Sequence, residues 1–227
     1  MKLTLRVVIH SVVWLCVLGG LLFGGAGTVR WPAAWVYLAE VALASVVFGT
    51  WMIRNDPGLV EERLDLSLWR KQKVRDSVVA ASFLVVYMAW HALMGIDAER
   101  LRWSSMPVWA QAAGAAAIAI SYVVVLQVCK VNSFASAALR VQTERHHKVI
   151  TTGPYAIVRH PMYAGALITF IGMPFLLGSW LGLIAIPLIV VVLVIRIYGE
   201  EALLRAELEG YEEYTRRVRW RLIPWVW

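Results

Sequence analysis

The chain has 227 residues, of which 60% are apolar and only 16% are charged. About a quarter of the residues in a soluble domain are charged, so this composition excludes a soluble enzyme and a disordered tail. The net charge of +7 would point to nucleic acid only if the basic residues formed a patch on a soluble domain.

Long stretches without charged residues follow one another along the chain. Within residues 1–129 there are four, and only the second is interrupted, by Glu40: residues 7–29, 31–53, 77–96 and 103–129. A helix that crosses a bilayer needs about 20 predominantly apolar residues. These stretches therefore predict four N-terminal spans.

The last uncharged stretch, residues 161–195, contains 35 residues. As one straight helix it would be roughly 52 Å long, against about 30 Å of hydrocarbon. We therefore expect it to fold back at Gly178, Ser179 and Trp180. This predicts an all-α integral membrane protein with about six transmembrane helices, of which the last two form a helical hairpin.

Basic residues are distributed unevenly among the predicted loops. With this topology, the segments on one side of the membrane carry 19 Lys and Arg residues and those on the other side carry 3. Basic loops face the cytoplasm, so both termini are predicted to be cytoplasmic. The basic excess then reflects topology, and we expect no nucleic-acid partner.

Polar residues concentrate in the C-terminal part, and the first such segment, residues 152–165, reads TGPYAIVRHPMYAG. Pro161 suits the first turn of a helix. This places His160 near the N-cap, beside the positive end of the helix dipole. Arg159 adds a guanidinium that can grip a carboxylate in a bidentate way. The segment therefore predicts a site for an anion.

A second polar segment follows the hairpin and contains Glu200 and Glu201. Two carboxylates where a span leaves the lipid are costly unless they bind cations or hydroxyls. Folding of the hairpin would bring them close to Arg159 and His160, at the cytoplasmic face. Downstream apolar residues recur at helical spacing and predict an amphipathic C-terminal helix, lying on the membrane or over the site: Leu204, Leu208, Tyr211 and Val218.

Simpler interpretations exist for each feature. Arg159 and His160 also suit a plain helix cap at the membrane interface, and the two glutamates suit a solvated helix end. The adjacent His146 and His147 lack further ligands at a suitable spacing, so no metal site is predicted.

Taken together, the C-terminal hundred residues resemble the membrane methyltransferase superfamily of isoprenylcysteine carboxyl methyltransferases and phospholipid methyltransferases. Upstream, residues 132–134 and 141–143 are similar to bacterial carboxyl methyltransferase-like members. The order and spacing of the following elements carry the resemblance: the run 153–165, the hydrophobic hairpin, Glu200, Glu201, Leu204, Leu208, Tyr211, Tyr214, Val218, Ile223 and Pro224.

The resemblance implies a methyltransferase that uses S-adenosylmethionine at the cytoplasmic face of a bacterial inner membrane. It implies a small lipophilic acceptor that arrives between helices from among the membrane lipids, and no obligate protein partner. Residues 1–227 then form a single membrane domain, with the catalytic part in residues 130–227. The implied catalytic residues are Arg159, His160 and Glu201, and the implied donor-binding residues are Gln142, Gly153, Tyr155, Arg159, His160, Tyr163, Glu200 and Glu201.

The sequence does not identify the chemical class of the methyl acceptor. A carboxylate needs no general base, whereas an amine or thiol must lose a proton, for which His160 or a glutamate is available. Phospholipid methyltransferases have a glycine-x-glycine element on the donor side, but here Gly25 and Gly27 lie at a predicted outer edge. This favours the carboxyl branch, with a phospholipid N-methyltransferase, an NADPH-dependent reductase of a lipid or sterol-like substrate, and a non-catalytic membrane protein as alternatives.

Overall fold

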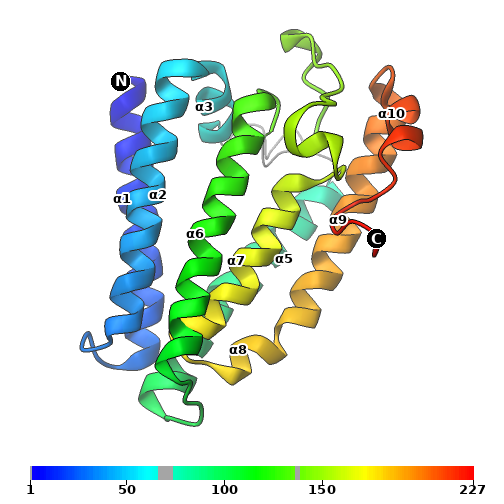
Figure 1. Ribbon diagram of the computed structural model, residues 1–227. Coiled ribbons are helices and arrows are strands. Elements are labelled where there is room, and N and C mark those ends of the chain that lie inside the picture. Colours follow the sequence, from blue (N-terminus) through cyan, green and yellow to red (C-terminus); the bar gives the residue numbers. More distant parts are fainter. Residues whose placement is uncertain (1, 66–73, 136–138) are drawn as a thin grey trace.

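The computed structural model describes residues 2–65, 74–135 and 139–227, and every regular element in these ranges is a helix (Figure 1). Arg70, Lys71 and Lys73, which contribute to the charge asymmetry, lie outside the described residues. The α-helices are α1 (Leu3–Ala26), α2 (Pro32–Asn55), α3 (Pro57–Leu64), α5 (Val74–Gly95), α6 (Val108–Val131), α7 (Pro161–Leu177), α8 (Trp180–Ile184), α9 (Ile186–Glu207) and α10 (Tyr211–Arg217). One turn of π-helix, η1 (Ile96–Arg100), extends α5, and two 3₁₀ turns, η2 (Thr143–Arg145) and η3 (Gly153–Ala156), shape the loop before α7.

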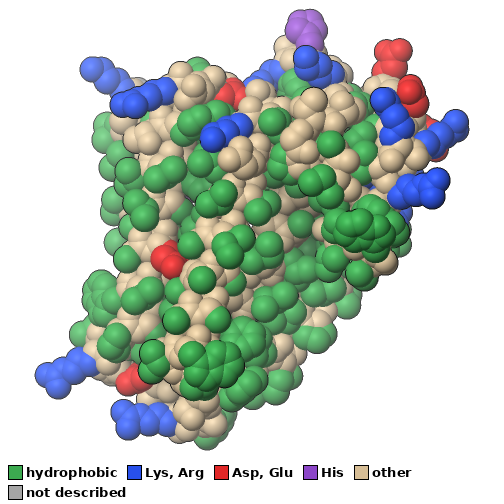
Figure 2. Space-filling model, viewed as in Figure 1, with side chains coloured by type: hydrophobic (Ala, Val, Ile, Leu, Met, Phe, Trp, Pro, Cys, Tyr) green, Lys and Arg blue, Asp and Glu red, His purple; other side chains and the backbone are tan. Residues whose placement is uncertain are grey.

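Five helical segments are long and apolar enough to cross a membrane: Leu3–Ala26, Pro32–Asn55, Ala80–Arg100, Val108–Val131 and Trp180–Glu207. On the face shown in Figure 2, charged side chains gather at the two ends, and the broad region between them is largely hydrophobic. The described residues therefore confirm an all-helical fold with five candidate membrane-spanning helices. Helix α7, with 17 residues, is shorter than these segments, so the count of six full spans is not confirmed.

The predicted hairpin is formed by α7 on one side and by α8 and α9 on the other (Figure 1). Helix α7 ends at Gly178, which adopts a left-handed conformation with φ of 80° that suits glycine. Ser179 then caps α8, because its hydroxyl oxygen accepts a hydrogen bond from the Gly182 N–H. The chain reverses at the residues where the sequence predicts the turn.

Buried Asp97, which belongs to η1, links η1 to this turn through hydrogen bonds. Its Oδ2 accepts hydrogen bonds from the Ser104 hydroxyl at 2.7 Å, the Ser179 hydroxyl at 2.5 Å and the Leu181 N–H at 3.2 Å. A buried carboxylate requires such donors. The hairpin is thus held at both ends, by this network and by the ionic groups near the start of α7.

Helices α6 and α7 pack closely because glycines face each other across the contact. A Cβ added to Gly114 would lie 2.5 Å from the Gly172 carbonyl oxygen and 2.4 Å from the Leu176 nitrogen. Both contacts are with backbone atoms, which cannot move aside as a flexible side chain can. This contact lies near the C-terminal end of α7, and nearer the start of the helix Gly165 packs against Val125 of α6.

We expect Gly114→Ala to lower the free energy of unfolding by about 1–3 kcal/mol, because the methyl group overpacks this contact. Gly20→Ala is the matched control, since a Cβ at Gly20 has no neighbour within 4 Å. The control should be neutral or slightly stabilising, because alanine is the better helix former. Thermal unfolding in detergent measures both variants, and equal melting temperatures would contradict this packing.

The C-terminal segment differs from the predicted amphipathic helix, which is not confirmed. Helix α9 continues to Glu207, and a bend at Gly210, with φ of 81°, separates it from the short α10. The apolar residues nevertheless cluster, because Leu208, Tyr211, Tyr214 and Val218 pack together and against Leu204. Their spacing indicated a shared apolar surface correctly, but glycine interrupts the helix that was expected to carry it.

Candidate active site

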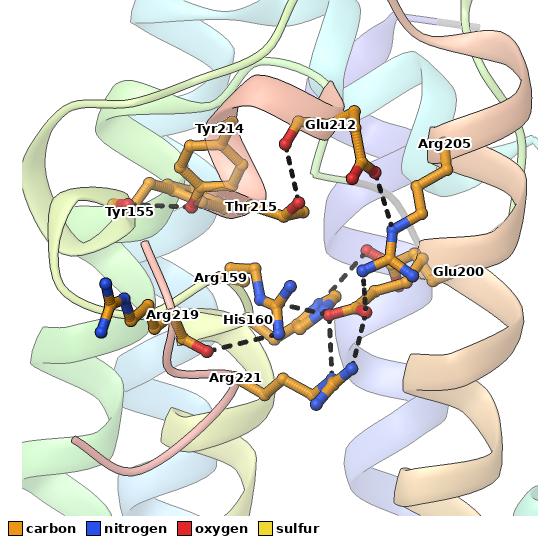
Figure 3. Close-up of polar contacts among 11 residues, drawn as sticks. Tyr155, Arg159, His160, Glu200, Arg205, Glu212, Tyr214, Thr215, Arg219 and Arg221 are labelled. Atoms are coloured by element: carbon orange, nitrogen blue, oxygen red, sulfur yellow. Dashed lines mark hydrogen bonds and ion pairs between the residues drawn. The ribbon is translucent and has the colours of Figure 1, made fainter. Parts of the chain in front are cut away.

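The start of α7 and the C-terminal tail are joined through their backbones. The Arg159 N–H donates to the Trp220 carbonyl and the His160 N–H to the Arg221 carbonyl, each at 2.9 Å. The Tyr214 hydroxyl donates to the Tyr155 carbonyl at 2.8 Å, which fixes α10 over η3. Segments that lie 60 residues apart in sequence therefore meet at one place (Figure 3).

Glu201 is the centre of a buried ionic cluster and is only 1% exposed. Its Oε1 lies 3.3 Å from both Arg159 Nε and His160 Nε2. Arg221 donates to both of its carboxylate oxygens at 3.1 Å, and Arg205 Nη2 lies 3.4 Å from Oε2. A buried carboxylate needs this number of partners to remain charged.

Glu200, one residue earlier, has different surroundings. Its Oε2 accepts a hydrogen bond of 2.5 Å from the Tyr163 hydroxyl, which itself accepts one of 2.9 Å from Arg196 Nε. His160 Nδ1 lies 3.7 Å from Glu200 Oε1, and the His160 ring stacks on Tyr163 at 5.7 Å. His160 therefore lies between the two glutamates and faces a carboxylate with each ring nitrogen.

These neighbours set the charge of His160. Burial acts to lower the pKa of His160, but hydrogen bonding and charge attraction from Glu200 and Glu201 outweigh it, and the pKa is raised. The imidazolium form is thus favoured in the folded protein.

A raised pKa makes the stabilising contribution of His160 depend on pH. The contribution is fully present below the ordinary histidine pKa of about 6.5 and is lost as the pH rises through the raised value. The difference in melting temperature between wild type and His160→Gln should therefore shrink over that window. The exposed His146, replaced by Asn, controls for removal of a histidine at the surface. A difference that stays constant with pH would contradict the imidazolium assignment.

Several of these ionic residues line one end of a cavity of about 820 Å³. Its polar end contains Arg159, His160, Tyr163, Arg196 and Glu200. Its other lining, which we call the apolar arm, comes largely from α1, α2 and α5 with one ring from α7, and includes Trp14, Tyr37, Phe48, Phe83, Tyr87 and Phe170. One cavity thus combines an ionic end with an aromatic and aliphatic arm.

The other predicted residues occupy different positions. Tyr155 lines the cavity, and its hydroxyl accepts a hydrogen bond from Asn132 Nδ2 at 2.6 Å. Gln142 is buried away from the cavity lining, donating to the Phe134 carbonyl and accepting from Arg145. Gly153 has φ of 59° and packs next to Val131. Donor contact by Gln142, Gly153 or Glu201 stays a prediction, and the geometry favours positioning roles for these three.

Arg63 on α3 is a cavity residue that the sequence does not reveal. Its guanidinium donates to the Ala135 carbonyl at 3.0 Å and lies 3.5 Å from Cys129 Sγ and 3.9 Å from Met162 Sδ. Sulfur is a weak acceptor, so this cation is only partly satisfied by these contacts. In the sequence Arg63 contributes only to the charge of a loop, with no motif around it that signals a site.

Comparison with known proteins finds relatives of the carboxyl-terminal part of the chain, which contains the ionic end of the cavity. Residues 109–209 match the family described as phospholipid methyltransferase. Protein-S-isoprenylcysteine O-methyltransferase B of Arabidopsis thaliana is 37% identical over 82 residues, which are 35% of this chain and 42% of that protein. The carboxyl-terminal part of the chain is thus similar to the isoprenylcysteine carboxyl and phospholipid methyltransferase superfamily.

Two further members of this superfamily, both named probable protein-S-isoprenylcysteine O-methyltransferase, come from Oryza sativa subsp. indica and subsp. japonica. Each is 38% identical over 82 residues, covering 35% of this chain and 43% of the relative. The chain thus spans less than half the length of the curated relatives it matches. The superfamily match includes Arg159, His160, Glu200 and Glu201, whereas α1, α2 and α5, which form much of the apolar arm, precede it.

Proposed function

We propose that this protein is an integral membrane methyltransferase that moves a methyl group from S-adenosylmethionine to a small lipophilic carboxylate. One observation carries the proposal: the ionic end of the cavity, which lies within the superfamily match, is continuous with an apolar arm within the membrane-spanning helices. A polar donor and a lipophilic acceptor can therefore meet inside one cavity.

The residues at the ionic end suit this donor. Glu200 offers a carboxylate for its ammonium group or its ribose hydroxyls. The N–H groups of Met162 and Tyr163, in the first turn of α7, have no acceptor within the helix and suit a carboxylate, with Arg159 close by. Tyr155 and Tyr163 present aromatic rings to the cavity. When bound, the donor supplies a methyl group on a positively charged sulfur.

The charges around the cavity favour an anionic acceptor. Among the basic residues in its described lining, Arg140 pairs with Glu62 and Glu144, and Arg159 pairs with Glu201. Arg63 and Lys148 add positive charge to these pairs, and the lining also includes Arg196 and the acidic Glu200. This excess attracts a carboxylate and repels an ammonium group. The apolar arm would hold the lipophilic part, exclude water and align the carboxylate with the donor. No side chain needs to remove a proton in this reaction.

A phospholipid N-methyltransferase is the second candidate, because the family description matched by residues 109–209 names phospholipid substrates. Its amine acceptor must lose a proton, and Glu200 would act as the base, because His160 is favoured as the imidazolium. The basic lining of the cavity favours the carboxylate over this amine.

Product chemistry separates the two candidates. Purified protein incubated with methyl-labelled S-adenosylmethionine and a lipid extract should give a labelled product in the organic phase. Mild alkali should release the label as methanol if the product is an ester, whereas a methylated amine keeps it. Absence of any labelled product would contradict both reactions. A calorimetric titration in which NADPH binds and S-adenosylhomocysteine does not would favour a reductase.

We further propose that the ionic end faces the cytoplasm of a bacterial inner membrane, with both termini on that side. The support is the distribution of basic residues, because Arg30, Arg100 and Arg102 lie at the opposite end, in the connections after α1 and α5. The cavity uses residues from both 1–129 and 130–227, which supports a single membrane domain. Labelling of single cysteines at Thr28 and Thr215 with a membrane-impermeant reagent tests the orientation. Reaction of Thr215→Cys from the periplasmic side would contradict it.

A further inference from the structure

Three polar side chains form a cluster in the apolar arm, away from the ionic end. Tyr37 lies on α2, and Tyr87 and His91 lie on α5. His91 is fully buried and Tyr37 is only 1% exposed. Tyr37 and Tyr87 both line the cavity. All three precede the residues of the superfamily match.

The hydrogen bonds of this cluster have defined directions. His91 Nδ1 lies 2.8 Å from the Tyr87 carbonyl oxygen, which can only accept, so Nδ1 carries the proton. In the neutral imidazole Nε2 is then an acceptor, and the Tyr37 hydroxyl, 3.1 Å away, must donate to it. The proton of Tyr37 is therefore committed to His91.

The hydroxyl proton of Tyr87 makes only a weak hydrogen bond among the described residues. Its hydroxyl oxygen lies 3.5 Å from that of Tyr37, at the outer limit of a hydrogen bond. The rings around Tyr87 include Trp14, Phe83, Trp90 and Phe170, which offer no strong acceptor. An O–H group in apolar surroundings is costly unless it finds a partner, and the cavity is the side from which one can come.

Helix α7 gives the approximate distance between the Tyr87 ring and the ionic end of the cavity. Phe170 is seven residues after Tyr163, a rise of about 10 Å along the helix. The Phe170 ring lies 6.1 Å from the Tyr87 ring. A molecule with its reacting group at the ionic end would therefore pass Tyr87 roughly 10 Å further along its length.

We propose that the Tyr87 hydroxyl, whose contact with the Tyr37 oxygen is long, turns from that contact and donates a hydrogen bond to a neutral oxygen carried on the apolar body of the acceptor. The oxygen belongs to a ketone, ether or hydroxyl group, and the acceptor is an oxygenated lipophilic carboxylate rather than a plain hydrocarbon chain. This inference rests on the proposed function for the position of the carboxylate.

Binding of stearate and of two oxostearate isomers, with the ketone in the middle or at the far end of the chain, tests this subsite without methyl transfer. The mid-chain isomer should bind wild-type protein about fivefold more tightly than stearate, as expected for one neutral hydrogen bond. Its ketone stretching frequency in the infrared should fall on binding. Tyr87→Phe should remove both effects, so that stearate and the mid-chain isomer bind this variant equally.

Tyr198→Phe is the matched control, because Tyr198 lies on α9 with half of its surface exposed. It should retain the preference for the mid-chain ketone. Equal affinities of wild type for the three acids, a preference that survives Tyr87→Phe, or no binding of any of them would overturn the subsite. Failure of methyl transfer would not, because these titrations contain no methyl donor.

Discussion

Glu200→Gln should weaken binding of S-adenosylmethionine about a hundredfold and reduce methyl transfer accordingly. Glu200 is the acidic residue in the described lining of the cavity, and a charge-assisted hydrogen bond contributes about 1.5–3 kcal/mol. The amide oxygen can still accept from the Tyr163 hydroxyl, so the fold should persist. Calorimetric titration with S-adenosylhomocysteine measures the loss.

The control for this variant is Glu209→Gln, since Glu209 is exposed beyond the end of α9. It removes the same charge from the same part of the chain and should bind the donor as wild type does. Unchanged affinity in Glu200→Gln, or equal losses in the two variants, would remove Glu200 from the donor site.

Glu201→Gln should instead destabilise the fold, by about 3–5 kcal/mol. Arg159, His160 and Arg221 all contact this buried carboxylate, and loss of its charge leaves them without their common partner. For a chain of this size the melting temperature should fall on the order of 10 °C. Thermal unfolding in detergent measures the effect.

Glu213→Gln provides the comparison, because Glu213 pairs with Arg217 four residues later and both side chains are largely exposed. An exposed pair of this kind contributes less than about 1 kcal/mol. Similar melting temperatures for Glu201→Gln and Glu213→Gln would contradict the structural role of the buried cluster.

The hairpin and the meeting of the two polar segments could be predicted because each follows from chain length and local chemistry. An uncharged stretch of 35 residues is too long for one span, and Gly178 and Ser179 supply the turn. Once that turn forms, the segments that flank it must approach each other.

The different roles of Glu200 and Glu201 could not be predicted from their sequence. Neighbouring residues on a helix point about 100° apart, so one faces the cavity and the other the C-terminal tail. Which one faces the cavity depends on how α9 packs. Arg63 and the cluster of Tyr37, Tyr87 and His91 were also missed, because they are assembled by tertiary contacts between helices that carry no motif.

A structure determined with S-adenosylhomocysteine is the most direct measurement of whether the ionic end is the donor site. The ligand is expected within hydrogen-bond distance of the Glu200 carboxylate and against the first turn of α7, with its sulfur towards the apolar arm. A ligand bound outside the cavity, or at its apolar end with Glu200 uninvolved, would contradict the proposed enzyme.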